Sequence, residues 1–313
     1  MFKNPFCICS LKNITFVLIM LRDKLINWSI LILLSLTWGT SFILMKKGLR
    51  SFDSLQIASL RIFISYLVLL PLAIGNIRKI NRQNFLSLLI IGLIGNALPA
   101  FLYPFAQRRI DSSVAGMLNA LTPLFTLLTG IIIYGRGARW RQVAGIMLGL
   151  AGAAGLLYRG SLSFDPLGLL IVLATLFYGI SSNQVTRIKK LNGAVITSLA
   201  FFIVGPLAGL SLLMNDFGPA LETENWLRNL GFISILSVFG SGIAVMLFNI
   251  LIIRTSPVYA VSVTYLAPLV STLWGYADGE NITVFMIISV ICILAGVYLT
   301  IRQKTPEVKR KEA

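Results

Sequence analysis

Residues 109–130 read RIDSSVAGMLNALTPLFTLLTG, and residues 254–275 read RTSPVYAVSVTYLAPLVSTLWG. A shift of 145 positions superimposes the two stretches, with arginine on arginine at the start, proline on proline in the middle and glycine on glycine at the end. A repeated stretch of this length is typical of a duplicated structural unit. We therefore interpret residues 27–158 and 166–301 as two copies of one unit, with loops of different length between their helices.

Composition places both copies in a membrane. Of the 313 residues, 57% are hydrophobic and 12% are charged, about half the charged fraction of a soluble protein. Ten apolar runs have the length needed to span a bilayer as helices. They cover residues 27–46, 55–75, 84–107, 112–134, 139–158, 166–187, 194–215, 229–253, 257–277 and 282–301. The runs are continuously apolar, without the alternation of barrel strands. The sequence predicts an all-α integral membrane protein with ten transmembrane helices.

The number of helices and the distribution of charge predict the topology. Five helices in each copy make the second copy enter from the opposite side, so the repeats are expected to be inverted. With the N-terminus in the cytoplasm, the cytoplasmic segments carry 19 of the 27 Lys and Arg residues. This asymmetry predicts a protein of the cytoplasmic membrane with both termini in the cytoplasm. The net charge of +16 then suits anionic lipid headgroups rather than nucleic acid.

The two flanking segments are interpreted as tails. Residues 302–313 form a basic cytoplasmic tail. Residues 1–26 are expected to be an N-terminal cytoplasmic tail lying at the membrane interface, because the apolar part is too short to span. An alternative is that translation starts at Met20, so that residues 1–19 are not made.

Ionisable groups are scarce within the predicted spans. The ten runs contain no Asp or Glu, and the chain has no His. A carboxylate relay for protons, a catalytic site and a metal site all need such groups. The pair Cys7 and Cys9 lacks further metal ligands. We expect no enzymatic activity, no cofactor and no bound metal.

Neutral polar and aromatic side chains recur on one face of several predicted helices. Small and polar residues also help to pack membrane helices, so packing is the alternative interpretation. Amides facing lipid or a dry core are costly, which favours a substrate pathway lined by the first, third, fourth, sixth, eighth and ninth runs. The predicted substrate-binding residues in these runs are Trp38, Ser41, Asn96, Tyr103, Asn119, Thr122, Tyr178, Asn183 and Asn249.

Three further features accompany this pathway. Pro123 and Pro268 lie inside the fourth and ninth runs, where each frees a backbone carbonyl and predicts a hinge. Arg61 is the one charge at membrane depth, and it could snorkel, meet a partner or clamp a substrate carboxylate. The motif Gly145-xxx-Gly149 predicts close helix packing, either within the bundle or between two protomers of a homodimer.

Four stretches of the sequence resemble the EamA-type domain of the drug/metabolite transporter superfamily. LTWGTSFILMKKGL at 36–49 and DSLQIASLRIFISYLVLLPLA at 53–73 are similar to the beginning of that domain. DSSVAGMLNALTPLFTLLTGIIIYG at 111–135 and GIMLGLAGAAGLL at 145–157 are similar to its end. The resemblance covers nearly all of the chain after residue 26, in both copies.

The resemblance implies ten helices in inverted five-helix repeats and transport of amino acids or other small metabolites. It also implies that Trp38, Asn119, Tyr178 and Tyr265 lie near the central cavity. The second copy departs from the pattern, because Tyr178 stands where the family has tryptophan and Asn183 has no close counterpart in the first run. A two-fold symmetric site is therefore not implied.

The sequence thus predicts a permease that moves small neutral or zwitterionic metabolites, amino acids or related compounds, by alternating access. One alternative is an exporter of cationic drugs or other toxic compounds, although the first run lacks the glutamate that would support it. Another is a membrane scaffold without transport, for which replacing Asn119 and Asn249 by leucine would change stability alone.

Overall fold

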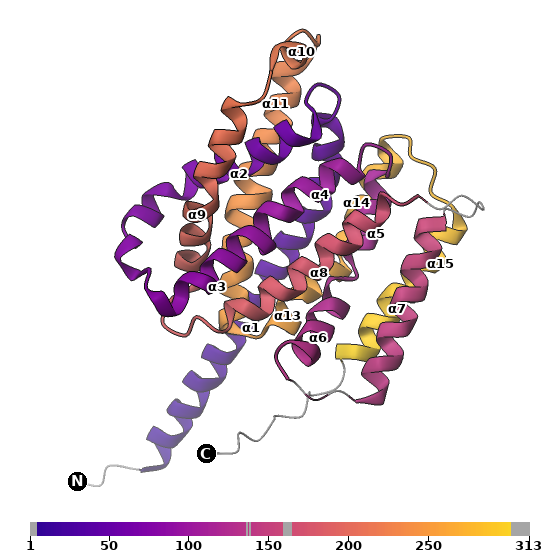
Figure 1. Ribbon diagram of the computed structural model, residues 1–313. Helices are drawn as coiled ribbons and strands as arrows, with labels where there is room; N and C mark the ends of the chain where they lie inside the picture. The colour runs from indigo at the N-terminus through magenta and orange to yellow at the C-terminus, as the bar shows by residue number, and fades with distance from the viewer. Residues whose placement is uncertain (1–4, 136, 138, 159–164, 302–313) are drawn as a thin grey trace.

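The computed structural model describes the backbone of residues 5–135, 137, 139–158 and 165–301, and within these ranges every regular element is a helix. The helices form one bundle (Figure 1). Their bounds in chain order are α1 Pro5–Gly48, α2 Ser54–Ile74, η1 Ile77–Lys79, α3 Arg82–Gly92, η2 Leu93–Ala97, α4 Leu98–Ala106, α5 Ser112–Asn119, α6 Thr122–Ile132, α7 Trp140–Tyr158, α8 Gly168–Val185, α9 Gly193–Leu213, α10 Gly218–Leu221, α11 Trp226–Ile235, η3 Leu236–Ile243, α12 Ala244–Arg254, α13 Pro257–Ala260, η4 Val261–Tyr265, α14 Ala267–Ala277 and α15 Val284–Ile301.

Nine helical segments within the described ranges are long and apolar enough to cross a membrane. They are Leu21–Gly48, Ser54–Ile74, Arg82–Ala106, Ser112–Ile132, Trp140–Leu157, Gly168–Val185, Gly193–Leu213, Trp226–Arg254 and Pro257–Ala277. The last predicted span contains a shorter apolar helix, Val284–Leu299. The chain is therefore a multi-pass membrane protein, and the tenth span stays a prediction.

The first helix is longer than the first apolar run of the sequence. α1 begins at Pro5 and continues without interruption through the segment interpreted as a tail, and it extends beyond the bundle in Figure 1. No proline or glycine occurs between Pro5 and Gly39, so nothing in the sequence breaks the helix there. The side chains of residues 1–20, including Cys7 and Cys9, lie outside the described part.

The two copies carry matching interruptions of their helices. The π-helical segments η2 and η3 contain Gly95 and Gly240 respectively, which are 145 positions apart. In the fourth run the helix stops after α5 and restarts as α6, with Pro123 in the first turn of α6. In the ninth run η4 separates α13 from α14, with Pro268 in the first turn of α14. The missing proline N–H is tolerated in a first turn, so both prolines stand directly after a break.

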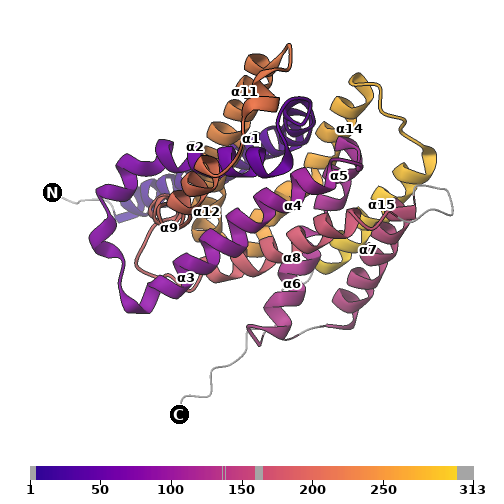
Figure 2. The ribbon, with the colours of Figure 1, turned by 45° about the horizontal axis from the view of Figure 1, so that its top comes forward.

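Two glycines show how the copies interlock. A side-chain carbon at Gly39 in α1 would lie 2.9 Å from the backbone oxygen of Ala267 in α14. A side-chain carbon at Gly179 in α8 would lie 2.7 Å from the Phe125 carbonyl carbon in α6. The first helix of each copy thus packs against the interrupted helix of the other copy, and α8 lies beside α6 in Figures 1 and 2.

The glycine motif of α7 packs within the chain. A side-chain carbon at Gly152 would lie 2.6 Å from the Ser289 backbone oxygen of α15, and one at Gly296 would collide with the backbone of Gly145 and Gly149. The two helices run side by side in Figures 1 and 2. Because this surface is covered by α15, the motif itself no longer indicates a homodimer.

Candidate functional site: a cavity between the two copies

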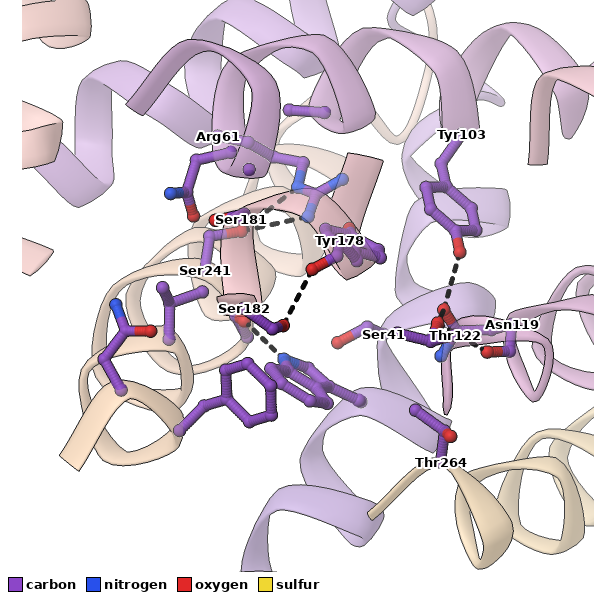
Figure 3. A pocket seen from close by; sticks show the side chains of 18 of the residues that line it. Ser41, Arg61, Tyr103, Asn119, Thr122, Tyr178, Ser181, Ser182, Ser241 and Thr264 are labelled. Carbon is purple, nitrogen blue, oxygen red and sulfur yellow. Dashed lines mark hydrogen bonds between the residues drawn. The ribbon is translucent and has the colours of Figure 1, made fainter. Parts of the chain in front are cut away.

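A cavity lies where helices of the two copies meet (Figure 3). The first copy lines it from α1, α2, η2, α4, α5 and α6, and the second copy from α8, α9, η3, α12 and η4. Eight of the predicted binding residues line the cavity: Trp38, Ser41, Asn96, Tyr103, Asn119, Thr122, Tyr178 and Asn249. Both π-helical segments contribute, since Asn96 follows Gly95 in η2 and Ser241 follows Gly240 in η3.

One wall of the cavity is a hydrogen-bonded group from α4, α5 and α6. The Tyr103 hydroxyl donates to Asn119 Oδ1 at 2.7 Å, and the Thr122 hydroxyl donates to the Asn119 backbone oxygen at 2.8 Å (Figure 3). The helix break that precedes Pro123 leaves this Asn119 carbonyl available. The Tyr103 ring stacks on Tyr178 of the second copy, with ring centroids 6.2 Å apart. Polar groups here are therefore held in place before any ligand arrives.

Another part of the cavity lining is aromatic. Trp38 donates its indole N–H to the Gly240 backbone oxygen at 3.0 Å, and its ring meets Phe248 edge-on with centroids 5.1 Å apart. Phe201 and Val245 add apolar surface to the same cavity. An apolar cavity with a few fixed polar groups is the usual form of a small-molecule site.

Arg61 of α2 also lines the cavity, and the set of expected binding residues did not include it. Its side chain is buried, so it does not snorkel to the membrane surface. Nε and Nη2 donate to the Ser241 hydroxyl of η3 at 3.2 and 3.0 Å (Figure 3). Nη1 is buried and has no hydrogen-bond partner in the part of the chain that the structure describes. The sequence signal was its isolation as the one cation within a span.

Two predicted residues lie outside the cavity. Asn183 is fully buried, and its amide nitrogen donates to the Thr126 backbone oxygen at 2.8 Å and to the Thr129 hydroxyl at 3.0 Å. It holds α8 against α6 and therefore contributes to helix packing. Tyr265 of η4 packs against the largest hydrophobic cluster instead of lining the cavity.

A second polar centre closes one end of the bundle, here called the network end. Glu280, in the connection between α14 and α15, accepts hydrogen bonds from Lys46 at 2.7 Å and from the backbone N–H groups of Ser112 and Ser113 at 2.9 Å. Burial alone would raise the pKa of Glu280, but these hydrogen bonds outweigh it and lower that pKa to about 2. Glu280 thus joins the end of α1 to the start of α5 as a carboxylate.

Asp278 extends the network at the same end. It pairs with Lys46 at 2.9 Å and with Lys47. Burial acts to raise the pKa of Asp278, but hydrogen bonds from Lys47 and Lys46 prevail and lower it. Midway along α1 lies a more exposed group, in which Arg254 donates to Asp23 at 3.1 Å and to Asn27 at 3.0 Å. The network end is therefore more extensively bonded than this group.

Comparison with known proteins agrees with this architecture. The chain is similar to the inner membrane transporter YedA of Escherichia coli, with 26% identity covering 89% of this chain and 94% of that protein. A transporter of Archaeoglobus fulgidus is 28% identical, covering 87% and 96% of the two chains. A probable terminal-alkyne amino-acid exporter of Streptantibioticus cattleyicolor is 24% identical, covering 40% and 42%.

A solved crystal structure shares the fold, with a TM-score of 0.60 at 20% identity over 90% of this chain and 96% of that chain. The model of the EamA-like transporter family matches residues 26–158 and again residues 167–302. The two matches coincide with the two copies read from the sequence and point to a transporter rather than an enzyme. The chain belongs to the EamA-like transporter family.

Proposed function

We propose that this protein is a permease of the cytoplasmic membrane for small neutral or zwitterionic metabolites, amino acids or related compounds. The observation that carries the proposal is the cavity between the two copies, which combines fixed neutral hydrogen-bonding groups with aromatic walls. Such a lining suits a small amphipathic molecule, which hydrogen-bonds at one end and packs an apolar part at the other.

The proposal includes ten spans arranged as two inverted repeats. Five helices per copy require the second copy to begin on the opposite side of the membrane. The matching interruptions at η2 and η3, and before Pro123 and Pro268, support an equivalence of the copies. The excess of Lys and Arg in the tails and even-numbered loops supports cytoplasmic termini.

Transport is proposed to occur by alternating access, with one copy rocking against the other around the cavity. The network end joins α1 and α5 of the first copy to the α14–α15 connection of the second copy through Glu280 and Asp278. Opening that end requires these ion pairs to separate. The interrupted helices at Pro123 and Pro268 supply positions where the helix axes can bend.

The charge of the cavity weighs against the alternative of a cationic-drug exporter. Among the described residues that line the cavity, Arg61 is the one charged residue and none carries a carboxylate. A positive ligand would therefore meet repulsion without a counter-ion. A membrane scaffold without transport would have no use for the cavity, and it predicts that replacing Asn119 and Asn249 by leucine changes stability alone.

The test is counterflow in proteoliposomes containing the purified full chain, with a panel of radiolabelled L-amino acids, at zero and at imposed pH gradient. We expect at least one amino acid to exchange at zero gradient and not to be concentrated by the gradient. Liposomes without protein and liposomes with the Asn119→Leu variant are the controls. Absence of exchange for the whole panel, or equal exchange by Asn119→Leu, would refute the proposal.

A further inference from the structure

Only part of the Arg61 guanidinium is hydrogen-bonded within the described part of the protein. Both hydrogen bonds from its guanidinium, through Nε and Nη2, end on the single hydroxyl oxygen of Ser241. Nη1 has no acceptor among the described residues, although Arg61 is buried, with a relative exposure of 9%. A guanidinium presents five N–H donors in a planar fork. At least the two donors of Nη1 are therefore left without a partner inside the protein.

No carboxylate in the described part of the chain pairs with Arg61. Within the described ranges it takes part in no ion pair, and its titratable neighbours in the cavity wall are the phenol groups of Tyr103 and Tyr178. A buried cation without a counter-ion is costly, and such a group inside a membrane is retained for a function. Ser241 orients the guanidinium but cannot neutralise it.

Arg61 is one of the residues that line the ligand space. Figure 3 shows the guanidinium of Arg61 between Ser241 and Tyr178, within the ring of cavity residues. A carboxylate matches the planar fork of an arginine with two parallel hydrogen bonds. Trp38 and Phe248 provide apolar surface in the same cavity.

We propose that Arg61 binds the carboxylate group of the transported metabolite, and that a carboxylate is therefore required for recognition. This inference rests on the proposed function, because it names the chemical class that the cavity accepts: small organic carboxylates, including the zwitterionic amino acids. Ser241 acts as a positioning residue that fixes the guanidinium. The described cavity lining offers no carboxylate to the ammonium group of a zwitterion. This group would instead contact aromatic faces and neutral hydrogen-bond acceptors.

The experiment compares three probes of nearly the same shape: phenylacetate, phenylacetamide and phenethylamine. Each is titrated against the purified full chain in detergent at constant ionic strength, and the shift of the thermal unfolding midpoint gives the apparent affinity. We expect phenylacetate to bind about 10- to 100-fold more tightly than phenylacetamide, as for hydrogen bonds to a charged group. Phenethylamine is expected to bind no better than the amide.

Arg61→Gln is expected to abolish the preference for the carboxylate, whereas Arg228→Gln, which removes an exposed arginine of α11, should retain it. Ser241→Ala keeps the guanidinium and should weaken the preference without removing it. If Arg61→Gln does not fold, the comparison of the three probes on the wild type and on Ser241→Ala still tests whether Arg61 recognises a carboxylate.

Equal binding of phenylacetate and phenylacetamide by the wild type, or an unchanged preference in Arg61→Gln, would overturn the inference. Stabilisation by millimolar chloride but not by phenylacetate would assign the site to an inorganic anion and also overturn it. A carboxylate preference without amino-acid exchange in proteoliposomes would uphold the Arg61 site while refuting the proposed function. Amino-acid exchange that Arg61→Gln leaves unchanged, together with the absence of a carboxylate preference, would refute the Arg61 site while upholding the proposed function.

Discussion

Lys46 Nζ lies 2.7 Å from Glu280 Oε1, and this ion pair joins the end of α1 to the connection that leads into α15. Glu280 also accepts the backbone N–H groups that open α5. Glu280→Gln removes the charge and weakens these bonds, so we expect a loss of about 1–3 kcal/mol in stability. Thermal unfolding in detergent measures it, and Glu222→Gln, at an exposed acid, is the matched control. Equal midpoints for the two variants would contradict the prediction.

The pH dependence of stability follows from the same carboxylate. The pKa of Glu280 is about 2 in the folded protein and near 4.5 ordinarily. Because the folded pKa is depressed, the stabilisation is fully present above about pH 4.5 and is lost as the pH falls toward 2. The difference in unfolding midpoint between wild type and Glu280→Gln should therefore shrink between pH 6 and pH 3. A difference that stays constant over this range would show that the carboxylate is not held as described.

Gly179 and Gly231 should respond to alanine with opposite signs. A side-chain carbon at Gly179 would lie 2.7 Å from the Phe125 carbonyl carbon, so alanine forces α8 away from α6 and costs about 1–3 kcal/mol. Gly231 lies in α11 with no atom within 4 Å of that position, and alanine there should stabilise the helix by about 0.5–1 kcal/mol. Unfolding midpoints in detergent test both. A stabilised Gly179→Ala variant would contradict the packing of the two copies.

Asn183 and Asn119 should separate stability from transport. Asn183→Leu removes hydrogen bonds between α8 and α6 outside the cavity, so we expect a lower unfolding midpoint and normal exchange at temperatures where the variant is folded. Asn119→Leu replaces a cavity amide, so we expect lost exchange with a smaller change in midpoint. Midpoints and counterflow are measured on the same preparations. The opposite assignment of the two effects would place the pathway elsewhere.

Much of the fold can be predicted from the sequence, because the duplication and the need to span a membrane restrict the possible arrangements of the helices. The two copies, the interruptions before Pro123 and Pro268 and most of the cavity lining follow from periodicity, proline chemistry and the cost of buried amides. The extension of α1 through residues 5–26 does not follow from hydropathy, because the apolar stretch there is too short to span a membrane. The absence of proline and glycine between Pro5 and Gly39 is what permits the helix to continue.

Contacts between distant segments could not be read from the sequence. Asn183 was expected in the pathway, since a buried amide can serve a ligand or a neighbouring helix, and only the position of α6 decides which. The Glu280 network depends on the meeting of α1, α5 and the α14–α15 connection. Arg61 stood out as a lone intramembrane charge, but its vacant Nη1 is visible only in three dimensions.

In the proposed mechanism, one cavity opens alternately to the two sides of the membrane. The most direct measurement is the labelling of a Ser182→Cys variant, in a background without the native cysteines, by a membrane-impermeant thiol reagent in vesicles of both orientations. Ser182 lines the cavity on α8. We expect labelling in both orientations, with Glu280→Gln raising the rate from the network end and lowering it from the other. Labelling from one side alone, whatever the state of Glu280, would contradict alternating access through this cavity.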